Sequence, residues 1–147
     1  MPIYFYGIHD AYGSFSNFSP HGVKLRDMWW PTSEHYFQAQ KFAGTAHEEA
    51  IRLANTPKQA AEMGRDRKRP LREDWEHVKD DMMREAVRQK FGTHKDIQQI
   101  LLDTGDEEIV ENAPSDYYWG IGADGSGKNM LGKILMEVRG ELRDERT

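Results

Sequence analysis

Three polar residues, Glu34, Gln38 and Lys41, are spaced at i, i+4 and i+7 in a stretch that begins with helix-start residues. On a helix this spacing places a carboxylate, an amide and an amine on one face. Such a face can perform acid-base catalysis or bind a polar ligand. The alternative is a solvated helix surface with a favourable Glu-to-Lys arrangement, which is the commoner meaning of this spacing alone.

A further lysine interrupts the longest amphipathic segment of the chain. Lys79 falls between the directions of Trp75, Val78 and Met82 on the apolar arc of that predicted helix. An ammonium group there must reach solvent along the helix margin, pair with a carboxylate, bind an anion or lose its charge. Lys79 therefore either extends to solvent or faces a site, as a nucleophile toward an opened sugar or as a partner for phosphate.

Residues 65–72 form a basic segment in which five Lys or Arg side chains accompany one Asp. Guanidinium groups bind phosphate oxygens in a bidentate geometry. The segment, beginning at Arg65, is therefore a candidate site for phosphate or pyrophosphate. The alternative is an exposed turn with solvated charges.

A glycine-rich stretch, residues 116–129, runs directly into the last predicted helix. A loop followed by a helix N-terminus is a geometry that favours anions. The spacing is not that of a Walker loop, and without a strong preceding strand it is not a convincing dinucleotide fingerprint. Asp116 and Trp119 flank Gly120 with a carboxylate and a stacking face, which are components of a nucleoside or sugar pocket. Flexible glycines in a surface turn are the alternative.

Composition excludes several kinds of chemistry. The absence of cysteine removes disulfides, thiol nucleophiles and thiolate zinc sites, and the six scattered histidines show no metal motif, so we expect neither metal nor cofactor. The net charge of −5 is opposite to that of a protein that coats duplex nucleic acid. No apolar run approaches the length of a membrane span, and no basic segment precedes an apolar run at the N-terminus, which predicts a cytoplasmic protein.

The hydrophobic patterns predict a mainly α fold with a minor β element, in one domain over residues 1–147. Strand character, with a small sheet or hairpin near the N-terminus, is expected at Ile3–Tyr6, Val23–Trp30 and Glu108–Val110. Helices are expected at Glu34–Phe42, at His47–Ala54, from Pro57 onward, and at Glu73–Phe91, Ile97–Leu102 and Met130–Leu142.

Motifs spread in order over nearly the whole chain resemble those of the NADAR family, also called the YbiA-like family. They are residues 12–18 (YGSFSNF), 32–42 (TSEHYFQAQKF), 72–75 (REDW), 78–79 (VK), 116–120 (DYYWG), 129–132 (NMLG) and 135–136 (LM). Each motif alone is weak, and the ordered set is specific. The resemblance implies a single compact helical domain of the YbiA-like type.

The resemblance also implies an N-glycosidase that hydrolyses the bond between a ribose carbon and a nitrogen. Two substrate classes are associated with the family: phosphoribosylamino-pyrimidine intermediates of riboflavin biosynthesis, and ADP-ribose attached to guanine bases of nucleic acid. The implied partner is therefore a small phosphorylated ribose or ADP-ribose substrate or, in the second class, ADP-ribosylated nucleic acid. No membrane partner is expected, and the oligomeric state is left open.

The residues in matching positions take expected roles by this resemblance. Cleavage builds positive charge at the anomeric carbon, so Glu34 and Asp116 are expected to stabilise it and to act as acid and base, in an unassigned order. In a second route Lys79, with Lys41 as its rival, attacks the opened sugar covalently. The residues expected to bind substrate are Asn17, Phe37, Gln38, Lys41, Arg65, Trp75, Trp119, Gly120 and Asn129.

Two other classes of function compete with the enzyme. A binding module would recognise ADP-ribose or a nucleotide without cleaving it, and an interaction protein would present the arc of Trp75, Met82 and Met83 to a partner. Glu34 and Asp116 in matching motif positions favour the enzyme. The acidic net charge favours a small metabolite over extended contact with duplex DNA.

Overall fold

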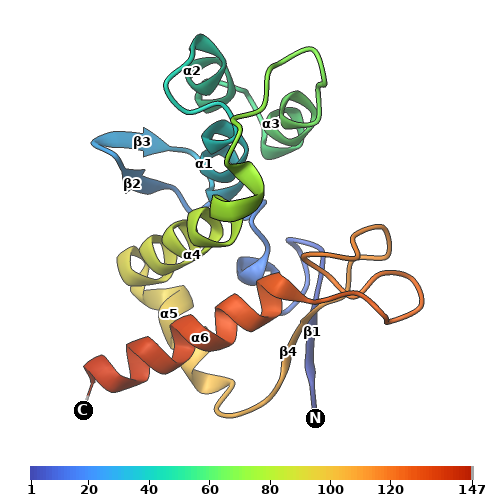
Figure 1. The fold of residues 1–147 in the computed structure, drawn as a ribbon. Coiled ribbons are helices and arrows are strands. Elements are labelled where there is room, and N and C mark those ends of the chain that lie inside the picture. The colour runs from blue at the N-terminus through green and yellow to red at the C-terminus, as the bar shows by residue number, and fades with distance from the viewer. Residues whose placement is uncertain (147) are drawn as a thin grey trace. The chain divides into compact units, whose positions relative to one another are not determined.

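The computed structural model describes residues 1–146 and is dominated by helices (Figure 1). The elements are β1 (Ile3–Phe5), a 3-10 turn (Gly13–Phe15), β2 (Val23–Leu25), β3 (Met28–Trp30), α1 (Ser33–Gln40), α2 (Ala46–Arg52), α3 (Pro57–Gly64), α4 (Trp75–Thr93), α5 (Lys95–Asp103), β4 (Ile109–Glu111) and α6 (Met130–Glu145). The predicted class, mainly α with a minor β element, is confirmed.

The chain divides into two compact units, one made of Met1–Ser19 with the chain from Phe91 onward, and the other of Pro20–Lys90. That the whole chain forms one domain stays a prediction. None of the helices in residues 1–146 is long and apolar enough to cross a membrane. The cytoplasmic location also stays a prediction.

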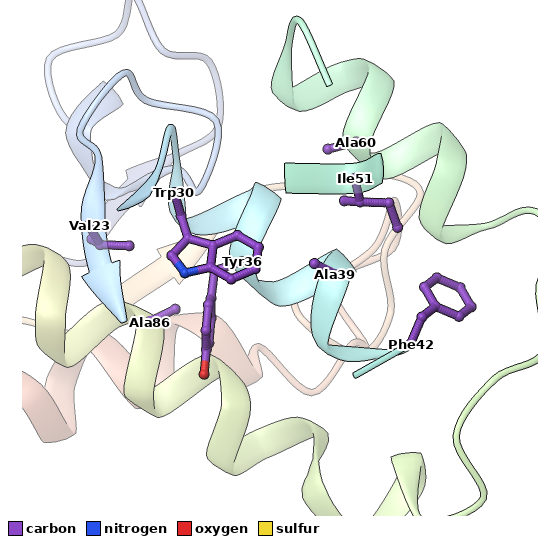
Figure 2. Close-up of a cluster of buried hydrophobic side chains, with 8 residues drawn as sticks. All are labelled: Val23, Trp30, Tyr36, Ala39, Phe42, Ile51, Ala60 and Ala86. Carbon is purple, nitrogen blue, oxygen red and sulfur yellow. The ribbon is translucent and has the colours of Figure 1, made fainter. Parts of the chain in front are cut away.

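In the unit of residues 20–90, α1 is the central helix, and α2 and α3 pack against it. Threonine starts all three helices, and at α1 the Thr32 side chain accepts a hydrogen bond from the backbone N–H of His35. Every residue of α1 is buried. Figure 2 shows the core around it, in which the Trp30 and Tyr36 rings meet edge to face at 5.2 Å. The alternative of a solvated α1 surface is therefore wrong.

The prediction for Val23–Trp30 needs a correction, because β2 and β3 form an antiparallel hairpin of their own. Arg26 and Asp27 make its turn with φ values of 56° and 62°. Two successive left-handed residues define the tight turn that matches the twist of paired strands. A pattern of strand-prone residues did not reveal this turn, since neither position is glycine or asparagine.

In the other unit, β1 pairs in parallel with β4, with Ile3 opposite Ile109. The helices α5 and α6 pack against each other, and α6 packs against β4. Arg139 of α6 is buried, and its Nη1 donates to Thr104 Oγ1 and to the Glu107 carbonyl, both at 2.8 Å. These bonds satisfy a cation that burial would otherwise make costly.

Lys90 of α4 leads to a pH prediction. Its side chain is 1% exposed, and burial lowers its pKa to about 7. An unfolded lysine keeps a pKa near 10.5, so the unfolded state binds more protons between about pH 7 and 10.5. The folded protein should therefore gain stability as the pH rises through this window. Below it, Lys90 is charged in both states and the cost of burying the charge is present in full.

Urea unfolding of the protein and of Lys90→Met between pH 6.5 and 9.5 measures this effect. We expect the stability of the original protein relative to Lys90→Met to increase with pH, because only the original protein carries this titrating group. A stability difference that does not change with pH would contradict the assignment.

Candidate active site

The polar face of α1 predicted from spacing is present, and it is buried. Glu34 and Gln38 are 8% and 7% exposed. Gln38 Nε2 donates to Glu34 Oε2 at 2.8 Å. Half-buried Lys41 follows the end of α1, and its Nζ donates to the carbonyl oxygen of Gly64 at 3.3 Å. A carboxylate, an amide and an amine thus lie together out of bulk water.

Lys41 binds its proton less tightly than an ordinary lysine. Burial is the largest cause of the lowered pKa, because it penalises the charged form. The Glu34 carboxylate opposes this effect, whereas the positive charges of Arg65 and Lys79 add to it. Lys41 therefore has a reactive environment for an amine.

Lys79 pairs with a carboxylate, which is one of the arrangements expected for a lysine on an apolar arc. Its Nζ forms an ion pair with Glu76 Oε1 at 2.7 Å, and the Glu76 carboxylate is largely exposed. Lys79 also acts on Lys41 through its charge. Its expected covalent role stays a prediction, as does that of its rival Lys41.

Two aromatic residues stand beside this polar group. The rings of Phe37 and Trp75 lie 5.2 Å apart, and Lys41 Nζ is 6.0 Å from the centre of the Phe37 ring. Both rings are almost fully buried. Trp75 nevertheless lines a cavity, described next. Its expected stacking role remains a prediction that this position permits.

A cavity of about 310 Å³ opens next to Lys41 and Trp75. Arg65, Arg67 and Arg69 line it together with Asp66, which makes its wall predominantly cationic. The basic segment divides here, because Arg72 is instead paired with Asp74 and donates its backbone N–H to the Lys41 carbonyl. The alternative of a wholly solvated turn therefore holds only for part of the segment.

The glycine-rich stretch lies in the other unit and differs from the predicted anion loop. The backbone N–H groups of Met130 and Leu131, at the start of α6, donate to the carbonyl oxygens of Tyr118 and Trp119 at 3.0 and 3.1 Å. Asp116 Oδ1 accepts hydrogen bonds from the backbone N–H groups of Tyr118 and Trp119. The prediction of a helix N-terminus open to an anion is wrong, because the loop itself occupies these donors.

Asn129 is buried, and its side-chain amide serves the backbone of β4. Its Oδ1 accepts from the N–H of Glu111 and its Nδ2 donates to the Ile109 carbonyl, both at 2.9 Å. Gly120 is also enclosed, since an added Cβ would lie 2.9 Å from the Glu111 carbonyl oxygen. These two positions have structural roles, and their expected contacts with substrate stay predictions, as does that of buried Asn17.

The predicted site residues thus fall into two groups. The unit of residues 20–90 holds Glu34, Phe37, Gln38, Lys41, Arg65, Trp75 and Lys79, and the other unit holds Asn17, Asp116, Trp119, Gly120 and Asn129. The pairing of Glu34 with Asp116 stays a prediction. We call Glu34, Gln38, Lys41 and Gly64 the α1 cluster.

Gly64 is a member of the α1 cluster that no sequence pattern predicted. A glycine after a helical pattern normally indicates a helix end, so its residue type does not reveal that its carbonyl binds Lys41. Within residues 1–146, no group of three or more His, Asp or Glu side chains is arranged to hold a metal ion.

Comparison with known proteins places the chain in a family. The model of the NADAR domain matches residues 4–143, and the chain belongs to the NADAR domain family. It is 54% identical to N-glycosidase Npun_R5314 of Nostoc punctiforme, over 98% of this chain and 94% of that protein. It is 49% identical to N-glycosidase YbiA of Escherichia coli, over 98% of this chain and 90% of that protein.

The fold agrees with the family assignment. The NMR structure of Escherichia coli YbiA matches with a TM-score of 0.92 over 99% of this chain and 87% of that chain. The riboflavin biosynthesis protein PYRR of Zea mays is 41% identical over 95% of this chain, which spans 25% of that larger protein. The predicted family and its YbiA-like fold are confirmed, as is the enzyme class, a hydrolase acting on N-glycosyl bonds.

Proposed function

We propose that this N-glycosidase cleaves the bond between ribose C1 and nitrogen in a small phosphorylated ribose compound, at the α1 cluster. The observation that carries the proposal is Lys41. Its amine is half-buried and has a lowered pKa, and the charge of the Glu34 carboxylate acts on it. Lys41 also lines the cavity to which the arginines contribute. These are the groups that a phosphorylated, cation-forming sugar requires.

Glu34 is the acid-base residue of this proposal. A carboxylic acid beside the sugar can protonate the ring oxygen as the ring opens, which leaves C1 as an imine carbon bonded to the base nitrogen. The resulting carboxylate then stabilises the positive charge on that imine. The Gln38 amide holds one Glu34 oxygen, and so directs the other toward this task.

Lys41 is the nucleophile. Its neutral amine adds to C1 of the opened sugar, and the base nitrogen leaves with a proton as a free amine, so that a Schiff base joins C1 to Nζ. Water then adds to C1 and forms a carbinolamine. Cleavage of its C1–Nζ bond releases the ribose aldehyde and restores the lysine amine. Lys79 assists through its positive charge, which helps to keep Lys41 neutral. Asp116 stays a predicted second carboxylate.

The arginine-lined cavity is the proposed site for the phosphate. Arg65 is exposed, lines the cavity and acts on Lys41 through its charge, so it can contact a phosphate near the reacting centre. Replacing Arg65 by Gln should raise KM by about tenfold for a phosphorylated substrate, the loss of one charge-assisted hydrogen bond.

The matched control is Lys68→Gln, since Lys68 carries the same charge in the same segment and is not among the cavity residues. Its KM should stay within about twofold, as is usual for a surface charge. Steady-state kinetics with phosphorylated and dephosphorylated substrate checks both variants. An equal rise in KM for both substrates would remove Arg65 from phosphate binding.

Among phosphorylated ribose compounds, a phosphoribosylamino-pyrimidine is the preferred substrate. The similarity to a riboflavin biosynthesis protein supports this choice, and so does the acidic net charge, which disfavours extended contact with nucleic acid. ADP-ribose on a guanine base is the other candidate, because an enzyme that holds a single modified base needs only a local basic patch.

A side-by-side turnover assay by mass spectrometry tests the proposal. The purified protein is offered the phosphoribosylamino-pyrimidine and a guanine oligonucleotide carrying ADP-ribose. Release of ribose 5-phosphate supports the metabolite, and recovery of unmodified guanine supports the nucleic-acid substrate. If the protein turns over neither compound but binds one of them tightly, the proposed cleavage of these two compounds is rejected, and the protein is a binding module for the compound that it binds.

A further inference from the structure

Gly64 occupies a position where the backbone does not require glycine. It is the last residue of α3, and its φ is not among the positive values of the chain. By helix propensity alone, alanine is preferred to glycine in a helix. The presence of glycine at this position therefore needs a reason outside the helix.

The reason lies in the space above its Cα atom. A Cβ at Gly64 would overlap Gln38 Oε1 and lie 2.7 Å from Gln38 Cδ and 3.1 Å from Gln38 Cβ. The Gln38 amide is thus packed directly against the bare backbone of α3. With any side chain at Gly64, the end of the Gln38 side chain has to leave its place.

The same glycine meets a second functional group, because its carbonyl oxygen accepts the hydrogen bond from Lys41 Nζ. The amide that it accommodates donates to Glu34 Oε2 through its nitrogen. Its oxygen, Gln38 Oε1, is buried and has no hydrogen-bond partner among residues 1–146. Steric contact with Gly64 therefore replaces a second hydrogen bond in fixing the orientation of this amide.

We propose that Gly64 is a positioning residue, which sets the Glu34 carboxylate through Gln38 and the Lys41 amine through its own carbonyl. This inference rests on the proposed function for the roles of Glu34 and Lys41. The contacts themselves do not depend on that function. Gly64 thereby links α3 to Glu34 of α1 and to Lys41, which follows that helix.

Four variants test the inference: Gly64→Ala, Gln38→Ala, the double variant, and Gly92→Ala as the control. Gly92 is also a helical glycine outside the positive-φ group, but a Cβ there would meet nothing within 4 Å. We expect Gly64→Ala to fold normally, since the two closest contacts fall on the flexible end of the Gln38 side chain. Its kcat should fall by about 10- to 100-fold, the effect of a misplaced catalytic group, with KM nearly unchanged.

The double variant separates positioning from a general structural effect. If Gly64 acts by making room for the Gln38 amide, Gly64→Ala adds no further loss of kcat in the Gln38→Ala background. Gly92→Ala should keep the original kcat. Losses that multiply in the double variant, or an original kcat in Gly64→Ala, would overturn the inference.

A second measurement does not depend on turnover. In the original protein the side-chain amide resonances of Gln38 should shift in NMR spectra as Glu34 is titrated, because the two groups are hydrogen-bonded. In Gly64→Ala this response should disappear, whereas in Gly92→Ala it should persist. Loss of the response with no turnover of any substrate would uphold the positioning role and reject the proposed function. A response that persists in Gly64→Ala would reject the positioning role.

Discussion

Replacing Lys41 by Met should abolish the adduct that borohydride traps during turnover and should lower kcat on the order of a thousandfold or more, the scale for loss of a nucleophile. The reason is that Lys41 supplies the amine with the lowered pKa, and methionine offers none. Mass spectrometry of the digested protein would place the reduced adduct on the peptide that contains Lys41. Lys41→Arg keeps a positive charge without a nucleophilic amine and should fail equally.

Lys79→Met is the control for Lys41. It should keep the trapped adduct on Lys41, because Lys79 contributes charge only. The rate requires a neutral Lys41, so it rises with pH as that proton is lost, and the lowered pKa places this rise below the ordinary value of 10.5. Removal of the Lys79 charge raises the pKa of Lys41, and the rise in rate should move to higher pH. An adduct located on Lys79 would exchange the roles of the two lysines.

Replacing Glu34 by Gln should lower kcat by about 10² to 10⁴, the usual contribution of a general acid or base. Glutamine has nearly the same shape as glutamate and also accepts the hydrogen bond from Gln38, so the fold is expected to be intact by circular dichroism. The exchange also removes the negative charge that favours protonated Lys41. Because glutamine keeps the shape and the hydrogen bond of Glu34 but cannot act as an acid or a base, binding of a non-hydrolysable substrate analogue should persist while turnover is lost.

The decisive outcome for Glu34 is the rate. A variant that turns over substrate at a near-normal rate would remove this carboxylate from the chemistry and transfer the acid-base role to Asp116. Asp116→Asn is the companion measurement, although the Asp116 carboxylate also accepts two backbone N–H groups in its loop. Its effect on thermal stability has to be measured beside its effect on kcat.

The helices were predictable because their signals are local. Threonine caps, proline at the start of α3 and apolar spacing lie within a few residues of the elements that they define. The boundaries that were predicted accordingly match the observed ones to within about three residues, a common uncertainty of helix boundaries. The face of Glu34, Gln38 and Lys41 followed from the same local geometry.

The features that sequence reasoning missed depend on contacts between distant residues. Spacing placed Lys41 on a helix face, but it did not show that α2 and α3 bury this helix or that Gly64 contacts its side chains. In the same way, the glycine-rich loop suggested an anion site, whereas its carbonyl groups occupy the first donors of α6. Local patterns identify which groups are present, and tertiary contacts decide which of them are available.

The pairing of β1 with β4 has a consequence for folding during synthesis on the ribosome. Ile3 emerges long before its partner Ile109, because the whole of residues 20–90 is made between the two. Residues 20–90, in contrast, are contiguous and can collect their contacts early. The N-terminal strand must therefore wait without its partner during translation, and a nascent chain arrested before residue 109 would leave it exposed to chaperones.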